Sequence, residues 1–171
     1  MTPLQETLSP QELAAQAETK ARQYELDYGA CPQCILRAVG ETLGGIDDAT
    51  IKASHGLSGG GALSGLGTCG ALTGGLLALS ARYGREKGAM DKGRCLINFK
   101  KCQGLVDRFR ATFGGITCEE LQEKFTGRRF NLWHIEEYKA FDEARGTQCA
   151  DATGAVAGWV TEEIAKAGGM R

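Results

Sequence analysis

The chain has 171 residues, which is enough for one domain with a proper hydrophobic core and short for two. Its formal net charge of -1 gives no electrostatic reason to expect binding to nucleic acid or to an anionic membrane. We therefore expect neither of these partners. No apolar run reaches the roughly 18 to 20 residues that cross a bilayer, and the first ten residues lack the features of a signal peptide.

We therefore expect a cytoplasmic protein without membrane insertion. Its seven cysteines are then thiols in a reducing compartment. An odd number of cysteines in a chain of this length favours metal binding or redox catalysis over a disulfide scaffold.

The first predicted element is an amphipathic helix that begins after Ser9 and ends at Gly29. Ser9, Pro10 and Glu12 have the pattern of a capping box with proline at the first helical position. Glycine is the residue most often found just past a helix end, which suits Gly29 to end this one.

A second helix is expected at the C-x-x-C pair Cys31 and Cys34, because Pro32 marks a first helical turn. A thioredoxin-like dithiol would need a neighbouring strand, and no run of alternating β-branched residues precedes the pair. Isoleucine at position 35 excludes the haem-attachment motif C-x-x-C-H. A zinc ribbon is disfavoured because no second C-x-x-C follows.

A glycine-rich loop from Gly56 to Gly67 then leads into a central helix. Thr68 is a good N-cap, so we expect Cys69 at the first helical position. His55 precedes the loop, where a lone histidine is more often a hydrogen-bonded structural residue than a ligand.

Two faces are expected on the central helix. One is an apolar stripe, and the other is a bare face of Gly70, Gly74 and Ala78. Glycine within a helix costs up to about 1 kcal/mol relative to alanine, so the bare face should lie against a backbone, a partner helix or a cofactor. Tight packing and cofactor contact remain equal alternatives, and the face also predicts a homodimer.

A long helix is predicted from Met90 to Thr112, with Cys95, Phe99 and Cys102 on its buried face. These two cysteines are interpreted as small core residues.

After a glycine break, Thr117 and Glu120 predict a second capping box, with Cys118 at the first helical position. Trp133 is expected to be tucked into a surface turn. Two final helices are expected over residues 135–144 and 150–167, and Cys149 lies at or just before the start of the last one.

These elements predict an all-α, single-domain helical bundle of about six or seven helices with a glycine-rich loop. Residues 1–30 form its N-terminal helix, and residues 31–171 form a cysteine-rich redox domain within the same compact unit. No strand is predicted.

The segment C-G-A-L-T-G, from Cys69 to Gly74, follows a glycine-rich run and has single cysteines far upstream and downstream. It resembles the C_GCAxxG_C_C family of redox-active proteins, which has this motif and four shared cysteines. The resemblance extends from about Cys34 to about Ala157. A related domain of split-Soret cytochromes c is associated with an iron-sulfur-type centre, so the resemblance implies metal or redox chemistry at the cysteines.

Matching the family's shared cysteines to this chain gives Cys34, Cys69, Cys118 and Cys149. Each is expected in the first turn of a helix, where free amides and partial positive charge stabilise a thiolate and lower its pKa. Four converging helix starts would suit an anionic [2Fe-2S] cluster. Further candidate ligands are Cys31 and His55.

Bare backbone can approach the inorganic sulfides of such a cluster closely. The glycines expected to do so are Gly59, Gly60, Gly61, Gly70 and Gly74. Because the chain lacks the haem-binding segment of the split-Soret proteins, electrons would pass to or from a separate redox partner protein.

Other interpretations of the cysteines stay open. Four thiolates also suit a structural zinc ion. A metal-free thiol/disulfide oxidoreductase with Cys69 as a low-pKa nucleophile is the main enzyme hypothesis. A Rieske centre is disfavoured, because His55 and His134 are not paired near cysteines. A further alternative is a small helical interaction protein, in which the cysteines would only pack as small side chains and would have no chemical role.

Overall fold

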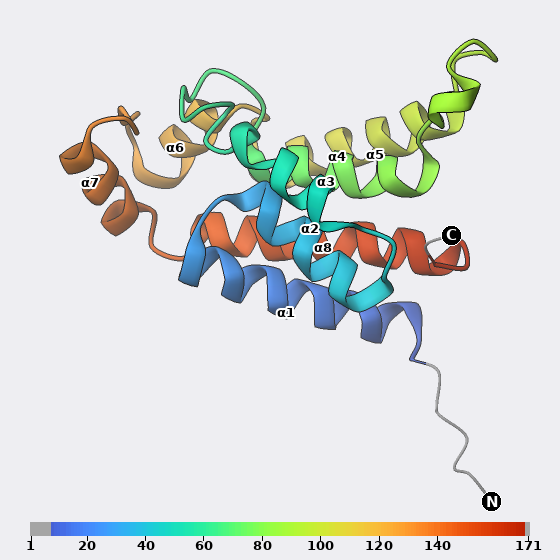
Figure 1. The fold of residues 1–171 in the computed structure, drawn as a ribbon. Coiled ribbons are helices and arrows are strands. Elements are labelled where there is room, and N and C mark those ends of the chain that lie inside the picture. The colour runs from blue at the N-terminus through green and yellow to red at the C-terminus, as the bar shows by residue number, and fades with distance from the viewer. Residues whose placement is uncertain (1–7, 170–171) are drawn as a thin grey trace, which may run out of the picture.

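A computed structural model describes residues 8–169 and has an all-α fold, as predicted (Figure 1). This part of the chain contains eight α-helices where about six or seven were expected. Its only β contact is one isolated bridge. The helices are α1 (Pro10–Tyr28), α2 (Cys31–Leu43), α3 (Asp48–Ala53), α4 (Gly70–Tyr83), α5 (Leu96–Phe113), α6 (Cys118–Thr126), α7 (Ile135–Arg145) and α8 (Gln148–Lys166).

Two predicted helix starts are confirmed by their caps. Ser9 and Glu12 form the capping box of α1, and Thr117 and Glu120 form that of α6. In both cases the glutamate bonds back to the amide of the capping residue, so two unpaired backbone donors are satisfied. Gly29 ends α1 as expected.

Helix α8 packs against α1, α2 and α4, and together these four helices enclose the main hydrophobic core. Small residues of α8 allow α1 to come very close: a Cβ added at Gly154 would lie 2.9 Å from the carbonyl oxygen of Glu18. No helix in residues 8–169 is long and apolar enough to cross a membrane.

Several helices begin at the same end of the bundle. Figure 1 shows α2, α4 and α8 beginning at the same end of the bundle, next to α6 and α7. A second, smaller core of Phe130, Leu132 and Phe141 holds α7 at this end. The amino-terminal ends of several helices, with their free amides, are therefore brought together.

The bare face of α4 is used for packing within the chain. A Cβ added at Gly74 would lie 2.9 Å from the Cα of Pro32 and 3.1 Å from the Cβ of Ile35, both in α2. A Cβ added at the neighbouring Gly75 would meet Val156 of α8 and Leu105 of α5. Because α2 covers this face, it offers no surface to a second copy of the chain.

Helix α5 begins at Leu96, six residues later than predicted from Met90. Cys95 is its N-cap in a left-handed conformation (φ 47°), and its thiol donates to the carbonyl of Tyr83. Phe99 is 60% exposed instead of lying on a buried face, because α5 packs on α4 and only lightly on α8. Trp133, expected to be tucked in, is 70% exposed, and its indole N–H donates to the carbonyl of Ala62.

Candidate functional site

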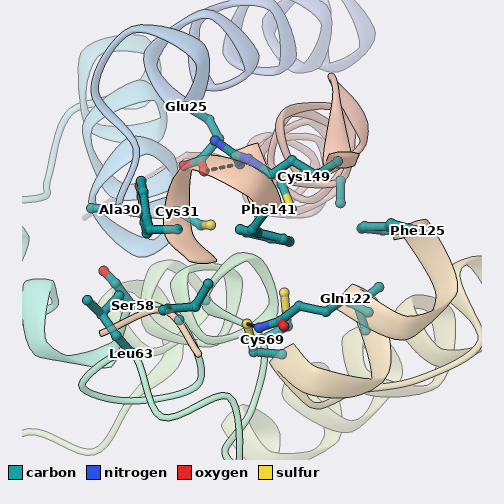
Figure 2. Close-up of a pocket in the computed structure, with 18 residues that line it drawn as sticks. Glu25, Ala30, Cys31, Ser58, Leu63, Cys69, Gln122, Phe125, Phe141 and Cys149 are labelled. Atoms are coloured by element: carbon teal, nitrogen blue, oxygen red, sulfur yellow. Dashed lines mark hydrogen bonds and ion pairs between the residues drawn. The ribbon is translucent and has the colours of Figure 1, made fainter. Parts of the chain in front are cut away.

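Four cysteines from four helices line one cavity of about 70 Å³ at this end of the bundle (Figure 2). Cys31 is the first residue of α2, Cys69 is the N-cap of α4, Cys118 is the first residue of α6 and Cys149 is the second residue of α8. Figure 2 shows Cys31, Cys69 and Cys149 around the same space. The starts of four helices, each with a cysteine, therefore converge on this cavity.

One of the four expected cysteines is not in this group. Cys34 is buried one turn further along α2, and its thiol donates to the carbonyl of Gly29 at 2.9 Å. It lines a separate surface groove together with His55, so neither residue reaches the cavity. Cys31 occupies the position that the sequence interpretation gave to Cys34.

A short antiparallel bridge ties the starts of α4 and α6 together. Thr68 pairs with Thr117 in this bridge. The Cys69 N–H donates to the carbonyl of Ile116 at 2.7 Å, and the Cys118 N–H donates to that of Gly67 at 3.0 Å. Thr68 is therefore not the N-cap that was predicted, because Cys69 itself takes that position.

The glycine loop supports this arrangement, but few of its glycines touch the cavity. Of the five glycines predicted to approach a cofactor, Gly59 and Gly70 line the cavity. Gly60 has φ +77°, and an added Cβ would lie 3.0 Å from the Cβ of Cys118, so it permits close packing. Gly61 faces open space, and Gly74 lies under α2.

The cavity wall also contains a buried ion pair that was not predicted. Arg145, near the end of α7, donates to Glu25 at 3.1 Å and to Asp142 at 2.6 Å. Glu25, Arg145 and Cys149 all line the cavity. The second carboxylate oxygen of Glu25 is buried without a hydrogen-bond partner. Glu25 and Arg145 are 120 residues apart, so no local sequence pattern indicates the pair.

Burial dominates the protonation of the four thiols. It raises the pKa of Cys149 to about 11, although the Arg145 cation acts in the opposite direction. Burial also raises the pKa of Cys31, Cys69 and Cys118. At Cys69 the amides at the start of α4 lower the pKa, but less than burial raises it. The helix starts therefore do not give these thiols the low pKa that was expected.

The pKa of Arg145 is also shifted by its surroundings in the cavity wall. Burial alone would lower the pKa of Arg145, but interactions with Cys149 and Asp142 outweigh it and raise the pKa above its ordinary value. Its charge is therefore permanent.

The cysteines of the cavity stand around a space with a largely apolar wall. In residues 8–169, no three His, Cys, Asp or Glu side chains lie close enough together to hold a single metal ion. The cavity is several times larger than the roughly 10 to 15 Å³ that one water needs. Its remaining wall is largely apolar and includes Leu63, Leu121, Phe125, Leu132 and Phe141. Four thiols around a largely apolar space are a donor set of the kind that iron-sulfur clusters take.

The chain matches a known protein family. The family described as "Putative redox-active protein (C_GCAxxG_C_C)" matches residues 29–163, a span that contains all seven cysteines. No curated protein and no solved structure matches the chain.

Proposed function

The chain belongs to the C_GCAxxG_C_C family of redox-active proteins, and on this basis we propose that it carries an iron-sulfur cluster of the [2Fe-2S] type. The proposed ligands are Cys31, Cys69, Cys118 and Cys149. The proposed activity is electron transfer to a redox partner protein.

The observation that carries this proposal is the convergence of four helix starts, each with a cysteine, on one cavity. Both common cluster types take four cysteine thiolates, and the ligated cluster is anionic. The partial positive charge and free amides of a helix start favour an anion. An anionic cluster would be unfavourable in purely apolar surroundings. The partial positive charges of four helix starts would compensate its negative charge.

Each part of the wall has a role when the group is bound. The cluster supplies one-electron chemistry. The four cysteines hold it, and ligation must remove their protons because burial keeps them neutral in the free protein. The apolar side chains exclude water, and Arg145 places a permanent positive charge beside Cys149. Low solvent access and nearby positive charge both affect the reduction potential.

We favour the cluster over the two alternatives for different reasons. A metal-free thiol/disulfide oxidoreductase needs a thiolate near neutral pH, and burial raises the pKa of Cys69, the expected nucleophile. A structural zinc ion needs ligands converging on one point at about 2.3 Å, and the side chains of the described residues form no such group.

The test compares Cys31 and Cys34, two cysteines near the start of α2. Protein purified without oxygen is expected to be coloured, to contain iron and acid-labile sulfide, and to bleach on reduction. Cys31→Ser should lose the iron and the visible bands, because a serine hydroxyl is a much weaker ligand than a thiolate. Cys34→Ser is the matched control on the same helix, and it should keep both.

Two results would contradict the proposal. Colourless protein with stoichiometric zinc and no sulfide would show a structural metal site. A centre that survives Cys31→Ser but is lost in Cys34→Ser would restore the ligand set inferred from the family resemblance.

A further inference from the structure

The connection between α4 and α5 forms an exposed surface that the proposed function does not use. We call residues 85–100 the α5 tip; they include the turn after α4 and the first turn of α5. Figure 1 shows this part of the chain projecting at the end of the bundle opposite α6 and α7. Four large apolar side chains are exposed here, Met90 at 61%, Leu96 at 64%, Ile97 at 54% and Phe99 at 60%.

The α5 tip is also basic. It contains five Lys or Arg residues and two acidic ones, so its balance is positive in a chain with a net charge of -1. All seven charged side chains are exposed. No ion pair within residues 8–169 involves any of the five basic ones, which are Arg85, Lys87, Lys92, Arg94 and Lys100. The net charge of the whole chain therefore conceals a local positive surface.

The apolar side chains at the start of α5 point in different directions. Successive residues of a helix are rotated by 100°, so Leu96, Ile97 and Phe99 spread over roughly 160° of the first turn of α5. A rigid protein would need a deep socket to contact all three at once. A fluid lipid layer can surround them, and its anionic headgroups complement the basic residues.

We propose that the α5 tip binds an anionic lipid surface, with its apolar side chains inserted at the level of the headgroups and its basic side chains against the phosphates. This is shallow peripheral binding and needs no helix that crosses the membrane. Each basic residue near such a surface contributes attraction that salt weakens.

The position of the α5 tip fits the cavity at the other end of the molecule. Cys69 is the N-cap of α4, and the tip starts two residues after the end of this helix, so the 14 residues of α4 separate the two sites by about 20 Å. A lipid surface at the tip would leave the cavity end facing away from the membrane. A redox partner could then reach that end while the chain is held at the surface.

The test is flotation of the protein with lipid vesicles. Vesicles of phosphatidylcholine alone are compared with vesicles that also contain phosphatidylglycerol, each at low and high salt. The protein should float only with the anionic vesicles, and high salt should reduce this binding. The double variant Arg94→Glu with Lys100→Glu should weaken binding to the anionic vesicles more than tenfold. The double variant Ile97→Ser with Phe99→Ser should also weaken this binding more than tenfold, but the effect of salt on the remaining binding should not change.

The matched controls lie on α7. Ile135→Ser removes a side chain that is 64% exposed, and Lys139→Glu reverses an exposed charge; both should bind as the unchanged protein does. Circular dichroism checks that every variant is folded. Absence of flotation, or equal loss in the α7 controls, would overturn the proposal. A different result would also overturn it. If the protein does not bind vesicles but its α5 tip binds a synthetic acidic amphipathic helix, the partner of this surface is a protein.

Discussion

Arg145 is held by two carboxylates with very different exposure. Glu25 is 3% exposed at its side chain and Asp142 is 56% exposed. The Arg145 side chain itself is 11% exposed, so its charge depends mainly on Glu25 for a buried counter-charge. Burial raises the pKa of Glu25, and the nearby guanidinium acts against this. Removing Arg145 would leave the Glu25 charge buried and unpaired, and removing Glu25 would leave Arg145 with the largely exposed Asp142 as its partner.

We expect Arg145→Met to lower the free energy of unfolding by about 3 to 5 kcal/mol, the usual cost of leaving one member of a buried pair uncompensated. Combining it with Glu25→Leu should recover a large part of this loss, because no buried charge remains. Urea denaturation of the two single variants and the double variant gives the coupling energy. Arg128→Met removes the partner of Glu137 from an exposed pair and should cost less than about 1 kcal/mol. Equal costs for Arg145→Met and Arg128→Met would show that Glu25 does not need the arginine.

At the scale of single residues, the sequence could show that cysteines occur at helix starts but not which of two neighbours faces a cavity. Cys31 and Cys34 are three residues apart at the start of α2. The choice between them depends on where α4 and α8 pack, since these helices supply the opposite walls of the cavity. The same holds for Glu25, because its partner Arg145 comes from a helix 120 residues away.

At the scale of elements, glycines of two helices are used in opposite ways. Gly75 of α4 lies under α5 and α8, where an added Cβ would be 2.7 Å from Leu105 and 2.5 Å from Val156. Gly104 of α5 has no atom within 4 Å of an added Cβ. Helix propensity favours alanine at both positions by up to about 1 kcal/mol. The space around each glycine therefore decides the sign of a substitution.

We expect Gly104→Ala to raise the free energy of unfolding by about 0.5 to 1 kcal/mol. Gly75→Ala should lower it by about 1 to 3 kcal/mol, because overpacking between helices outweighs the gain in propensity. Thermal or urea denaturation of the two variants measures both effects. A stabilising Gly75→Ala would mean that α4 can move away from α8 at little cost.

The helix ends show what local sequence can determine. Ser9 with Glu12 and Thr117 with Glu120 specify their caps within four residues, and both starts were predicted correctly. Thr68 had the same kind of signal, but its backbone pairs with Thr117, which is far away in sequence. The start of α5 was predicted too early, because periodic residues continue through a turn in which Cys95 has a left-handed conformation. Apolar periodicity also could not indicate that Phe99 has no helix to cover it.

At the scale of the whole molecule, the two hydrophobic cores differ greatly in extent. The main core joins α1, α2, α4 and α8, and it also includes Phe109 of α5. The second core consists of Phe130, Leu132 and Phe141 with a few partly buried neighbours. Cys118 and Cys149 are among those neighbours, so the proposed cluster would join the smaller core to the larger one.

Removing the proposed metal centre should therefore loosen one end of the molecule and leave the rest folded. After treatment with a chelator and a reductant, we expect amide hydrogen exchange in α6, α7 and the glycine loop to become more than tenfold faster, because four ligand bonds no longer connect them to the main core. Exchange in the middle of α1 and α8 should change little, since these helices line the cavity only near one end, through Glu25 of α1 and through Cys149 and Ala152 of α8. A uniform increase throughout the chain would show instead that the whole fold depends on the metal. Unchanged exchange in α6 and α7 would show that the small core and the bridge of Thr68 and Thr117 hold this end without it.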